Sequence, residues 1–382
     1  MNSITIGDAC EVLNGYAFKS EKYTESGIRI IRISNVQKGY IEDNAPAFYP
    51  LDSMGLEKYM LEENDLLISL TGNVGRVALL SKEFLPAALN QRVACLRLKT
   101  DRIKKSFLFH ILNSEYFEQQ CVNSSKGVAQ KNMSTEWLKE YSIPLYSIEK
   151  QVEISFILDT LQSIITHRRT QLEKLDELIK ARFVEMFGDP VSNTHNLPTL
   201  PITELGELGR GVSKHRPRND PDLLGGVYPL IQTGDVAASN LYITNYSSTY
   251  SELGLKQSKM WKKGTLCITI AANIAKTAIL DFDACFPDSV VGFIANDKTN
   301  NIFIHYWFSF FQAILEAQAP ESAQKNINLK ILSELKVIVP EKLKQNEFVN
   351  FIDQICKSKV AVQKALDEAQ LLFDSLMQEY FG

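Results

Sequence analysis

The sequence predicts an α+β fold made of two similar mixed α/β domains, each followed by a long α-helix, with the two helices pairing as an antiparallel coiled coil. The chain's 382 residues exceed the usual size of one domain, and its segments recur in the same order in both halves. After the domain in each half comes a segment in which apolar residues recur at alternating intervals of three and four residues. The expected division is a first domain at 1–148, a helix at 149–187, a linker at 188–201, a second domain at 202–340 and a helix at 341–382.

The internal repeat is weak in identity but constant in the order of its segments. The openings ITIGDACEVLNGYAF and ITELGELGRGVSK are followed by GIRIIRISNVQKGYI and GVYPLIQTGDVAASNLYI, and then by ENDLLISLTGNVGRVALL and KGTLCITIAANIAKTAIL. The four residues AQKN occur at 129–132 and again at 323–326. Because a repeat decides the whole architecture, this order predicts two copies of one domain plan.

Short apolar runs rich in β-branched residues predict the strands of both domains. They are bounded by Gly, Asn or Pro, and no regular alternation of strand and helix connects them. This pattern favours an irregular mixed sheet over a doubly wound parallel one. The predicted strands are 28–33, 65–69, 77–80 and 93–98 in the first half and 266–270, 277–282 and 290–294 in the second.

The long helices are predicted from one apolar stripe that keeps its register when 194 is added to each position. A 3-4 spacing over about five heptads favours a coiled coil, and each helix would be about 58 Å long at about 1.5 Å per residue. Pro144 and Pro340 precede the helices, and Gly188 ends the first. The predicted helix seam is Ile154, Leu158, Leu161, Ile165, Leu172, Leu175, Ile179 and Met186, with Arg168 and Arg182, and then Phe348, Ile352, Ile355, Lys359, Leu366, Ala369, Phe373 and Tyr380, with Val362 and Leu376 at the positions that match the two arginines.

Antiparallel pairing of the two helices within one molecule would hold the domains at opposite ends of a stiff spacer. The alternative is that each helix pairs with a helix of another molecule. In either case the polar residues beside the seam, such as Glu173, Lys174, Gln363 and Lys364, are expected to be a solvated face.

Composition narrows the function classes. The net charge is -4 and the pI is about 5.9, which does not favour binding of nucleic acid by the whole surface. The six cysteines lack metal-ligand spacing, so reduced thiols in a cytoplasmic protein without a bound metal are expected. No signal peptide is recognisable, and no apolar run approaches the roughly 20 residues that span a bilayer.

Motifs of the common catalytic sites are missing from the sequence. We find no GxxxxGK[ST], no GxGxxG at the start of a helix, no GxSxG, no HExxH and no Asn- or Asp-Pro-Pro-aromatic motif of amino-methyltransferases. The five histidines are scattered, and His110 and His305 lie in aromatic segments typical of a core. The chain is therefore expected to have no catalytic residues and no cofactor of its own.

Candidate DNA contacts lie in local loops that carry amides, cations and glycines. Each loop has an ordinary alternative as a solvated hairpin or loop, and Asn132 or Ser134 could instead cap a helix. Because AQKN recurs, it is expected to contact something common to both halves, such as phosphate or a partner. The predicted contacts are Thr71, Asn73, Arg76, Asn90, Gln91, Arg92, Lys126 and Lys131 in the first half, and Lys214, Arg216, Arg218, Asn273, Lys276 and Lys325 in the second.

Taken in order, these features resemble the specificity subunit of type I restriction-modification enzymes. The resemblance covers essentially the whole chain and depends on NDLLISLTGNVGRVALL, on the segment from AQKN to IPLYSIEKQVEI and on FGDP after the first helix. The second half departs from the pattern, because KGTLCITIAANIAKTAIL lacks the glycines and VIVPEKLKQNEF is a looser copy. That departure bears on which functions the loops of the second half share with the family, and less on the identity of the second half as a repeat.

The resemblance implies two target recognition domains that each bind one half of a split double-stranded DNA site. It implies that the helices fix the gap and dock two methyltransferase subunits, which use S-adenosylmethionine to methylate adenine, and that a motor-nuclease subunit joins for restriction. Two other functions remain open from the residues: a stand-alone DNA-binding or bridging protein without an enzyme partner, and an enzyme whose site is unrecognised.

Overall fold

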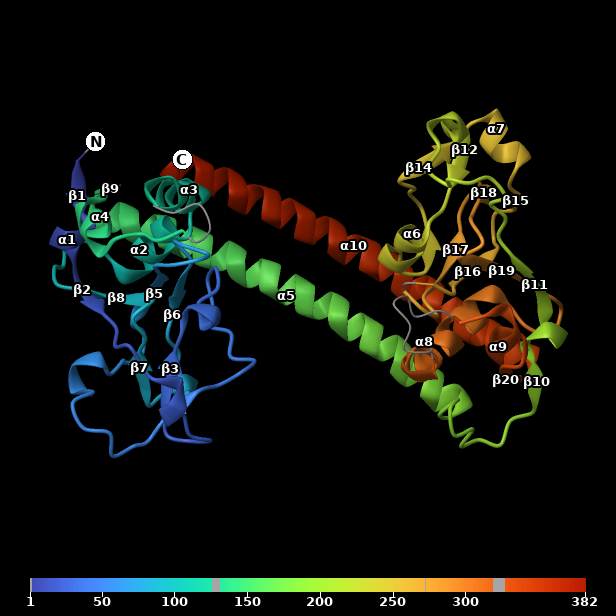
Figure 1. Cartoon of the computed structure of the whole chain (residues 1–382), viewed down its shortest axis with the longest axis horizontal. Helices are drawn as coiled ribbons and strands as arrows, with labels where there is room; N and C mark the ends of the chain where they lie inside the picture. Colours follow the sequence, from blue (N-terminus) through green and yellow to red (C-terminus); the bar gives the residue numbers. More distant parts are fainter. Residues whose placement is uncertain (1, 126–130, 272, 319–326) are drawn as a thin grey trace. The chain divides into compact units, whose positions relative to one another are not determined.

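The computed structural model describes residues 2–125, 131–271, 273–318 and 327–382, and the chain divides into two compact units (Figure 1). Unit 1 contains Met1–Arg169 and Gln363–Gly382, and unit 2 contains Thr170–Val362. The expected division treated each long helix as a segment of its own. The units instead share each helix between them, because apolar side chains of both helices belong to the cores of both units.

Unit 1 places a four-stranded antiparallel sheet, in the order β2-β8-β5-β6, beside a three-stranded sheet, in the order β4-β3-β7. In the second sheet β3 and β7 run parallel, and the short strands β1 and β9 pair separately. The elements are β1 (Ser3–Thr5), α1 (Ile6–Ala9), β2 (Cys10–Asn14), β3 (Ile28–Ile31), β4 (Phe48–Tyr49), β5 (Leu66–Ser69), β6 (Val77–Leu79), β7 (Ala87–Leu89), β8 (Val93–Leu98), α2 (Lys105–Leu112), α3 (Glu115–Ser124), α4 (Thr135–Glu140) and β9 (Ser142–Pro144).

Unit 2 repeats this arrangement with one strand added to each of the larger sheets. The orders are β11-β19-β16-β17-β13 and β14-β12-β18-β15, with β12 parallel to β18, and β10 pairs with β20. The elements are β10 (Thr199–Pro201), β11 (Gly206–Arg210), β12 (Leu224–Leu230), α6 (Thr233–Ala238), β13 (Tyr242–Ile243), β14 (Ser248–Tyr250), α7 (Glu252–Lys256), β15 (Met260–Trp261), β16 (Leu266–Thr269), β17 (Thr277–Leu280), β18 (Ala284–Cys285), β19 (Val290–Ala295), α8 (Asn301–Gln318), α9 (Leu329–Ser333) and β20 (Lys336–Ile338).

The shared topology confirms the prediction of two copies of one domain plan. It also refines the register of the opening segments: Ile6 donates its N–H to Tyr141 O in unit 1, and Ile202 donates its N–H to Leu335 O in unit 2, both at 2.9 Å. Ile6 is therefore the structural equivalent of Ile202. The sequence alignment instead matches Ile4 with Ile202, two residues too early in the first half. The predicted strands are all present, most of them one or two residues shorter than expected.

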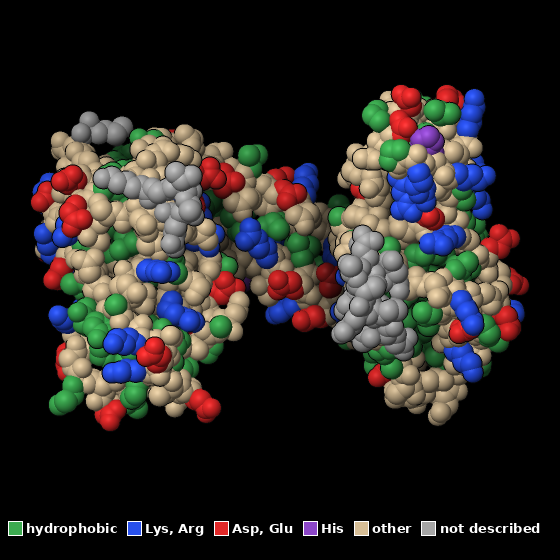
Figure 2. All heavy atoms as spheres, viewed as in Figure 1, with side chains coloured by type: hydrophobic (Ala, Val, Ile, Leu, Met, Phe, Trp, Pro, Cys, Tyr) green, Lys and Arg blue, Asp and Glu red, His purple; other side chains and the backbone are tan. Residues whose placement is uncertain are grey.

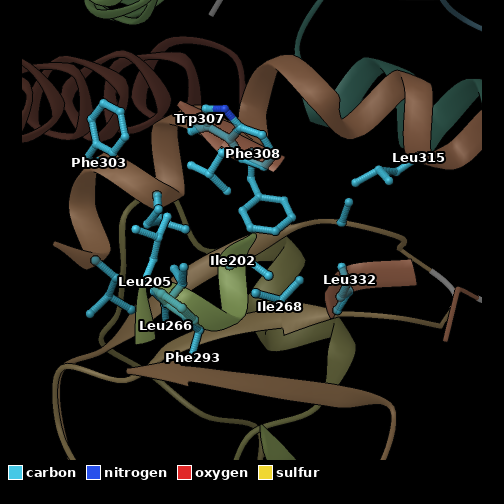
Figure 3. Close-up of a cluster of buried hydrophobic side chains, with 14 of the residues drawn as sticks. Ile202, Leu205, Leu266, Ile268, Phe293, Phe303, Trp307, Phe308, Leu315 and Leu332 are labelled. Carbon is cyan, nitrogen blue, oxygen red and sulfur yellow. The ribbon is translucent and has the colours of Figure 1, made fainter. Parts of the chain in front are cut away.

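The central sheet of each unit is covered on both faces. In β5, Leu66 and Ile68 pack against the helices, whereas Leu67 packs toward the second sheet. In β16, Leu266 and Ile268 join a core with Phe303 of α8 and other aromatic side chains (Figure 3). Burial on both faces explains why these strands are continuous apolar runs in the sequence.

The long helices are α5 (Ile148–Phe187) and α10 (Lys342–Phe381). Within unit 1, Ile154 near the start of α5 shares a core with Phe373 near the end of α10. Within unit 2, Phe183 near the end of α5 contacts Phe348 near the start of α10, with ring centroids 5.4 Å apart. The helices therefore contact each other in opposite directions within each unit. Their description as a continuous coiled coil stays a prediction.

The predicted helix seam is mostly buried, with one correction at the end of α5. There the buried stripe continues from Ile179 through Phe183 and Phe187, rather than through Arg182 and Met186, which are only half-buried. At this end α5 lies on the core of unit 2, so a spacing of four residues replaces the 3-4 spacing. The other predicted positions divide into buried residues, Ile154, Leu158, Leu161, Ile165, Phe348, Ile352, Ile355, Val362 and Leu366, and half-buried residues, Arg168, Leu172, Leu175, Lys359, Ala369, Phe373, Leu376 and Tyr380.

Candidate nucleic-acid interface

The turn between β5 and β6 presents an arginine that two amide side chains hold in place. Ser69 Oγ donates to Asn73 O at 2.5 Å and accepts from the Arg76 N–H at 3.0 Å, which closes the turn. Arg76 Nη1 donates to Gln37 Oε1. With the Asn73 amide oriented so that its oxygen faces the guanidinium, that oxygen accepts from Nη1 at 3.3 Å and from Nη2 at 3.2 Å. The Arg76 side chain is thus held at the surface by Gln37 and Asn73.

The turn between β16 and β17 keeps the same hydrogen bonds although it lacks the glycines. Thr269 Oγ1 donates to Asn273 O and accepts from the Lys276 N–H at 3.1 Å. Ala275 takes a φ of 57°, close to the left-handed φ of 83° at Gly75. That conformation costs a residue with a Cβ about 1–2 kcal/mol. Asn273 and Lys276 therefore stand where Asn73 and Arg76 stand in unit 1.

Lys131 and Asn132, the last two residues of AQKN, run along the β5–β6 turn. Gly72 donates its N–H to Lys131 O at 2.9 Å, and Thr71 and Asn132 form an isolated antiparallel bridge. The structure thereby brings together two predicted loops that are about 60 residues apart in the sequence. The Lys131 side chain is exposed beside the turn.

The residue after AQKN is bound in the same way in both units: the Met133 N–H donates to Leu70 O, and the Ile327 N–H donates to Ile270 O, both at 2.9 Å. The predicted contacts Lys126 and Lys325 lie outside the described residues. Of the two residues considered as helix caps, Ser134 is the one that caps α4. The alternative role as a helix cap therefore holds for Ser134 and not for Asn132.

The turn between β7 and β8 contains three predicted DNA contacts, of which one is buried and two are exposed. Asn90 is 7% exposed, and its Oδ1 accepts from the Arg92 N–H at 3.3 Å. Arg92 O in turn accepts from the Leu70 N–H at 2.9 Å, which ties this turn to the β5–β6 turn. Asn90 therefore shapes the turn, whereas Gln91 and Arg92 are exposed.

The basic segment of unit 2 leaves the sheet beside the turn between β18 and β19. Gly211 donates its N–H to Val290 O at 2.8 Å, and Val212 donates its N–H to Phe286 O at 3.1 Å. The equivalent segment of unit 1 is anchored in the same way, by the Tyr16 N–H on Leu89 O at 2.8 Å. The following residues Lys214, Arg216 and Arg218 are exposed.

We call the surface formed by these turns the loop edge of each unit. It comprises 15–18, 69–76, 90–92 and 131–133 in unit 1, and 211–218, 269–271, 273–276 and 287–289 in unit 2. Its amides, guanidinium groups and ammonium groups are those that contact phosphates and base edges in DNA. Figure 2 shows acidic side chains interspersed with the Lys and Arg side chains on the visible face, in keeping with the net charge of -4.

Apart from His215, which lies on the loop edge of unit 2, the histidines and cysteines lie away from the loop edges or within the cores. His110 Nε2 is 2.8 Å from Asp159 Oδ1, and His305 Nδ1 is 3.0 Å from Thr277 Oγ1. All six thiols are free, and burial raises the pKa of Cys10 to about 12. In the described part of the chain, no three His, Cys, Asp or Glu side chains gather as metal ligands. None of the described helices is long and apolar enough to cross a membrane.

Each unit also contains a cavity between its domain and its portions of the long helices. The cavity of unit 1, about 980 Å³, is lined by His110 of α2, Asp159 of α5 and Phe373 of α10 among others. The cavity of unit 2, about 870 Å³, is lined by Tyr306 of α8 and Lys359 of α10 among others. The two cavities therefore occur beside corresponding helices of the repeat.

Two buried glutamines escaped the sequence-based prediction. Gln151 and Gln345 are 0% exposed and stand 194 positions apart, the same offset as AQKN. Gln151 Nε2 donates to Arg102 O and Tyr146 O, both at 2.9 Å, and its Oε1 accepts from the Lys104 N–H at 2.8 Å. A search for polar residues that keep the repeat offset would have found this pair.

Gln345 repeats the bonding of Gln151 at the start of α10. Its Nε2 donates to Lys298 O at 3.0 Å and to Pro340 O at 2.9 Å, and its Oε1 accepts from Thr299 Oγ1 at 3.0 Å. Each glutamine thus fastens the beginning of a long helix to the loop that precedes α2 in unit 1 or α8 in unit 2.

A family model of the type I restriction modification DNA specificity domain matches the chain twice, over residues 1–176 and 199–369. The specificity subunit of the type I restriction enzyme EcoBI from Escherichia coli is 25% identical over 407 residues, covering 98% of this chain and 83% of that relative. The putative type I restriction enzyme MjaX specificity subunit of Methanocaldococcus jannaschii is 24% identical, covering 95% and 89%.

Solved structures share the fold. The S subunit of a type I restriction-modification system from M. genitalium matches with a TM-score of 0.59 and 15% identity, covering 100% of this chain and 96% of that one. A second match is a chain from a structural study of complex assembly and conformational transition in the type I R-M system. Its TM-score is 0.61 and its identity 16%, and the match covers 100% of this chain and 97% of that one.

Proposed function

Because the chain belongs to the type I restriction-modification specificity family, we propose that it reads a two-part DNA site, one half with each unit, on behalf of a methyltransferase. The family domain is a DNA specificity domain and not a catalytic one. The observation that carries the proposal is the loop edge, which is constructed twice with the same turn hydrogen bonds, both backbone to backbone and backbone to hydroxyl, but with different exposed side chains. Two such edges suit two half-sites of different sequence.

The long helices support a role in setting the unspecified gap between the half-sites. Each is continuous over 40 residues, which corresponds to about 60 Å at about 1.5 Å per residue. Half-sites one helical turn apart lie about 34 Å from each other along DNA. We propose that the number of helical residues between the units determines the length of the gap.

Partner subunits are the other part of the proposal. Two methyltransferase subunits that bind S-adenosylmethionine, together with a motor-nuclease subunit for restriction, would supply the chemistry that the sequence lacks. One cavity beside the long helices in each unit is consistent with two equivalent docking places. The acidic pI of about 5.9 fits a complex in which the partners provide much of the phosphate contact.

We expect DNA binding to depend on the methyltransferase partner. A gel-shift titration would compare the purified chain with the chain plus that partner on a duplex of the two-part site. Affinity should rise at least about tenfold with the partner, a difference of about 1.4 kcal/mol, because the partner adds phosphate contacts. A duplex with scrambled half-sites controls for non-specific binding. Equal, tight, sequence-specific binding by the chain alone would instead establish the stand-alone DNA-binding protein.

A further inference from the structure

We propose that unit 2 reads a guanine in its half-site through Arg218, and that Asp288 is the positioning residue for this arginine. The inference rests on the proposed function, since it assumes that unit 2 faces DNA. It starts from a cluster at the β18–β19 turn, where Asp288 contacts three arginines of the single segment 210–218.

Asp288 connects three arginines. Its Oδ1 accepts from Arg218 Nη2, its Oδ2 accepts from Arg216 Nη2 at 3.4 Å, and its main-chain oxygen accepts from Arg210 Nε at 2.5 Å. The side chain of Arg218 is 47% exposed and that of Asp288 is 27% exposed. The carboxylate therefore fixes guanidinium groups at a surface that stays open to a ligand.

The two arginines that bind the carboxylate, Arg216 and Arg218, differ in how many of their N–H groups remain open. Arg216 Nη1 also donates to Ser213 O at 2.6 Å and to His215 O at 2.8 Å, so this guanidinium is used to close its own loop. Within the described part of the chain, Arg218 has Asp288 as its hydrogen-bond partner through one hydrogen of Nη2. Its Nε, its Nη1 and the second hydrogen of Nη2 stay open, so one bidentate edge, Nε with Nη2 or Nη1 with Nη2, is available. Arg218 is thus a held guanidinium with free donors in one plane.

The presence of the Asp288 carboxylate distinguishes two possible roles of the arginines, contact with phosphate and contact with a base. A loop that binds only phosphate gains from every cation and loses from a nearby anion, so Asp288 would weaken it. A base contact needs an oriented guanidinium, since a bidentate bond to guanine O6 and N7 tolerates little rotation. An acidic residue placed directly on the arginines therefore favours base readout.

The cluster also lies where a base contact requires it, on the loop edge. Ser289, next to Asp288, accepts the Ile270 N–H at 3.0 Å, which joins this turn to the turn that carries Asn273 and Lys276. Those two residues can contact the neighbouring backbone phosphates. In unit 1 the position of Asp288 is taken by Gln91, so the two half-sites would be read by different chemistry.

The test uses the chain in complex with its methyltransferase partner. Methylation rates would be compared on duplexes that carry each of the four bases at every position of the two half-sites. We expect the wild type to require guanine at one position of one half-site. Arg218→Ala should reduce discrimination at that position by about 5- to 150-fold, the range of one bidentate guanine contact. Asp288→Asn should relax the same position less, and the other half-site should be unchanged.

Lys262→Ala serves as the matched control, because Lys262 pairs with Asp283 elsewhere in unit 2, at 2.8 Å. A uniform decrease at all positions for Arg218→Ala would mean a phosphate contact and would overturn the inference. The inference would also be overturned if Arg218→Ala discriminated between bases as well as the Lys262→Ala control does. A wild-type site that requires guanine at no position of either half-site would overturn it too. In these cases the two-part site would still stand. A wild type without a two-part site would remove the proposed function itself.

Discussion

Replacing Gln151 with leucine should lower the free energy of unfolding of unit 1 by about 3 kcal/mol. Leucine has a similar volume but leaves Arg102 O, Tyr146 O and the Lys104 N–H without their partner in the core. Buried backbone groups that lose a partner cost about 1–3 kcal/mol each. Urea denaturation of the full chain, followed by circular dichroism, would measure the change.

Gln345→Leu should have an effect of similar size on unit 2, because its hydrogen bonds are equivalent. Gln354→Leu is the matched control, since Gln354 is exposed on the same helix. If Gln345→Leu unfolds at the same urea concentration as Gln354→Leu, the buried glutamines do not hold the helix starts.

Replacing Phe183 with alanine should destabilise unit 2 by about 3–5 kcal/mol, the usual cost of removing a buried phenylalanine side chain. Phe183 is 0% exposed and contacts Phe187, Phe303 and Phe348, with ring centroids 5.0 to 5.4 Å apart. It joins α5 to α8 and α10, so methylation by the complex should fall together with stability.

The matched control is Val184→Ala, because the neighbouring Val184 is 39% exposed and should lose much less. The measurements are thermal unfolding of the chain and the methylation rate of the complex at a low and a raised temperature. A Phe183→Ala chain as stable as Val184→Ala would mean that the end of α5 does not belong to the core of unit 2.

The fold was largely predictable because its signals repeat. The strands from Leu66 and from Leu266 are continuous apolar runs, and the 194-residue offset connects the two helices. The prediction erred where tertiary packing overrides periodicity, at Phe183 and Phe187, which leave the coiled-coil spacing to enter the core of unit 2. Phenylalanines in a helix show that a face is buried but not which neighbour buries it.

The candidate site was predictable in part. Polar loops such as 69–76 could be chosen from residue types, and the structure brings them to one edge. The partners of their side chains could not be predicted, because Gln37 with Arg76, and Asp288 with Arg218, meet only after the chain folds. Burial of Asn90 likewise depends on how the β7–β8 turn packs, which residue type does not reveal.

The central claim, a split site with a gap set by helix length, is tested most directly by a genome-wide methylation map. The map would compare cells without the gene, cells with it, and cells with a shortened gene that lacks 166–172 in α5 and 366–372 in α10. Removing one heptad from each helix takes away about 10 Å of length. We expect the gene to add a two-part motif, and the shortened gene to keep both half-sites with a gap about three base pairs shorter. An unchanged gap with altered half-sites, or a single continuous motif, would contradict the claim.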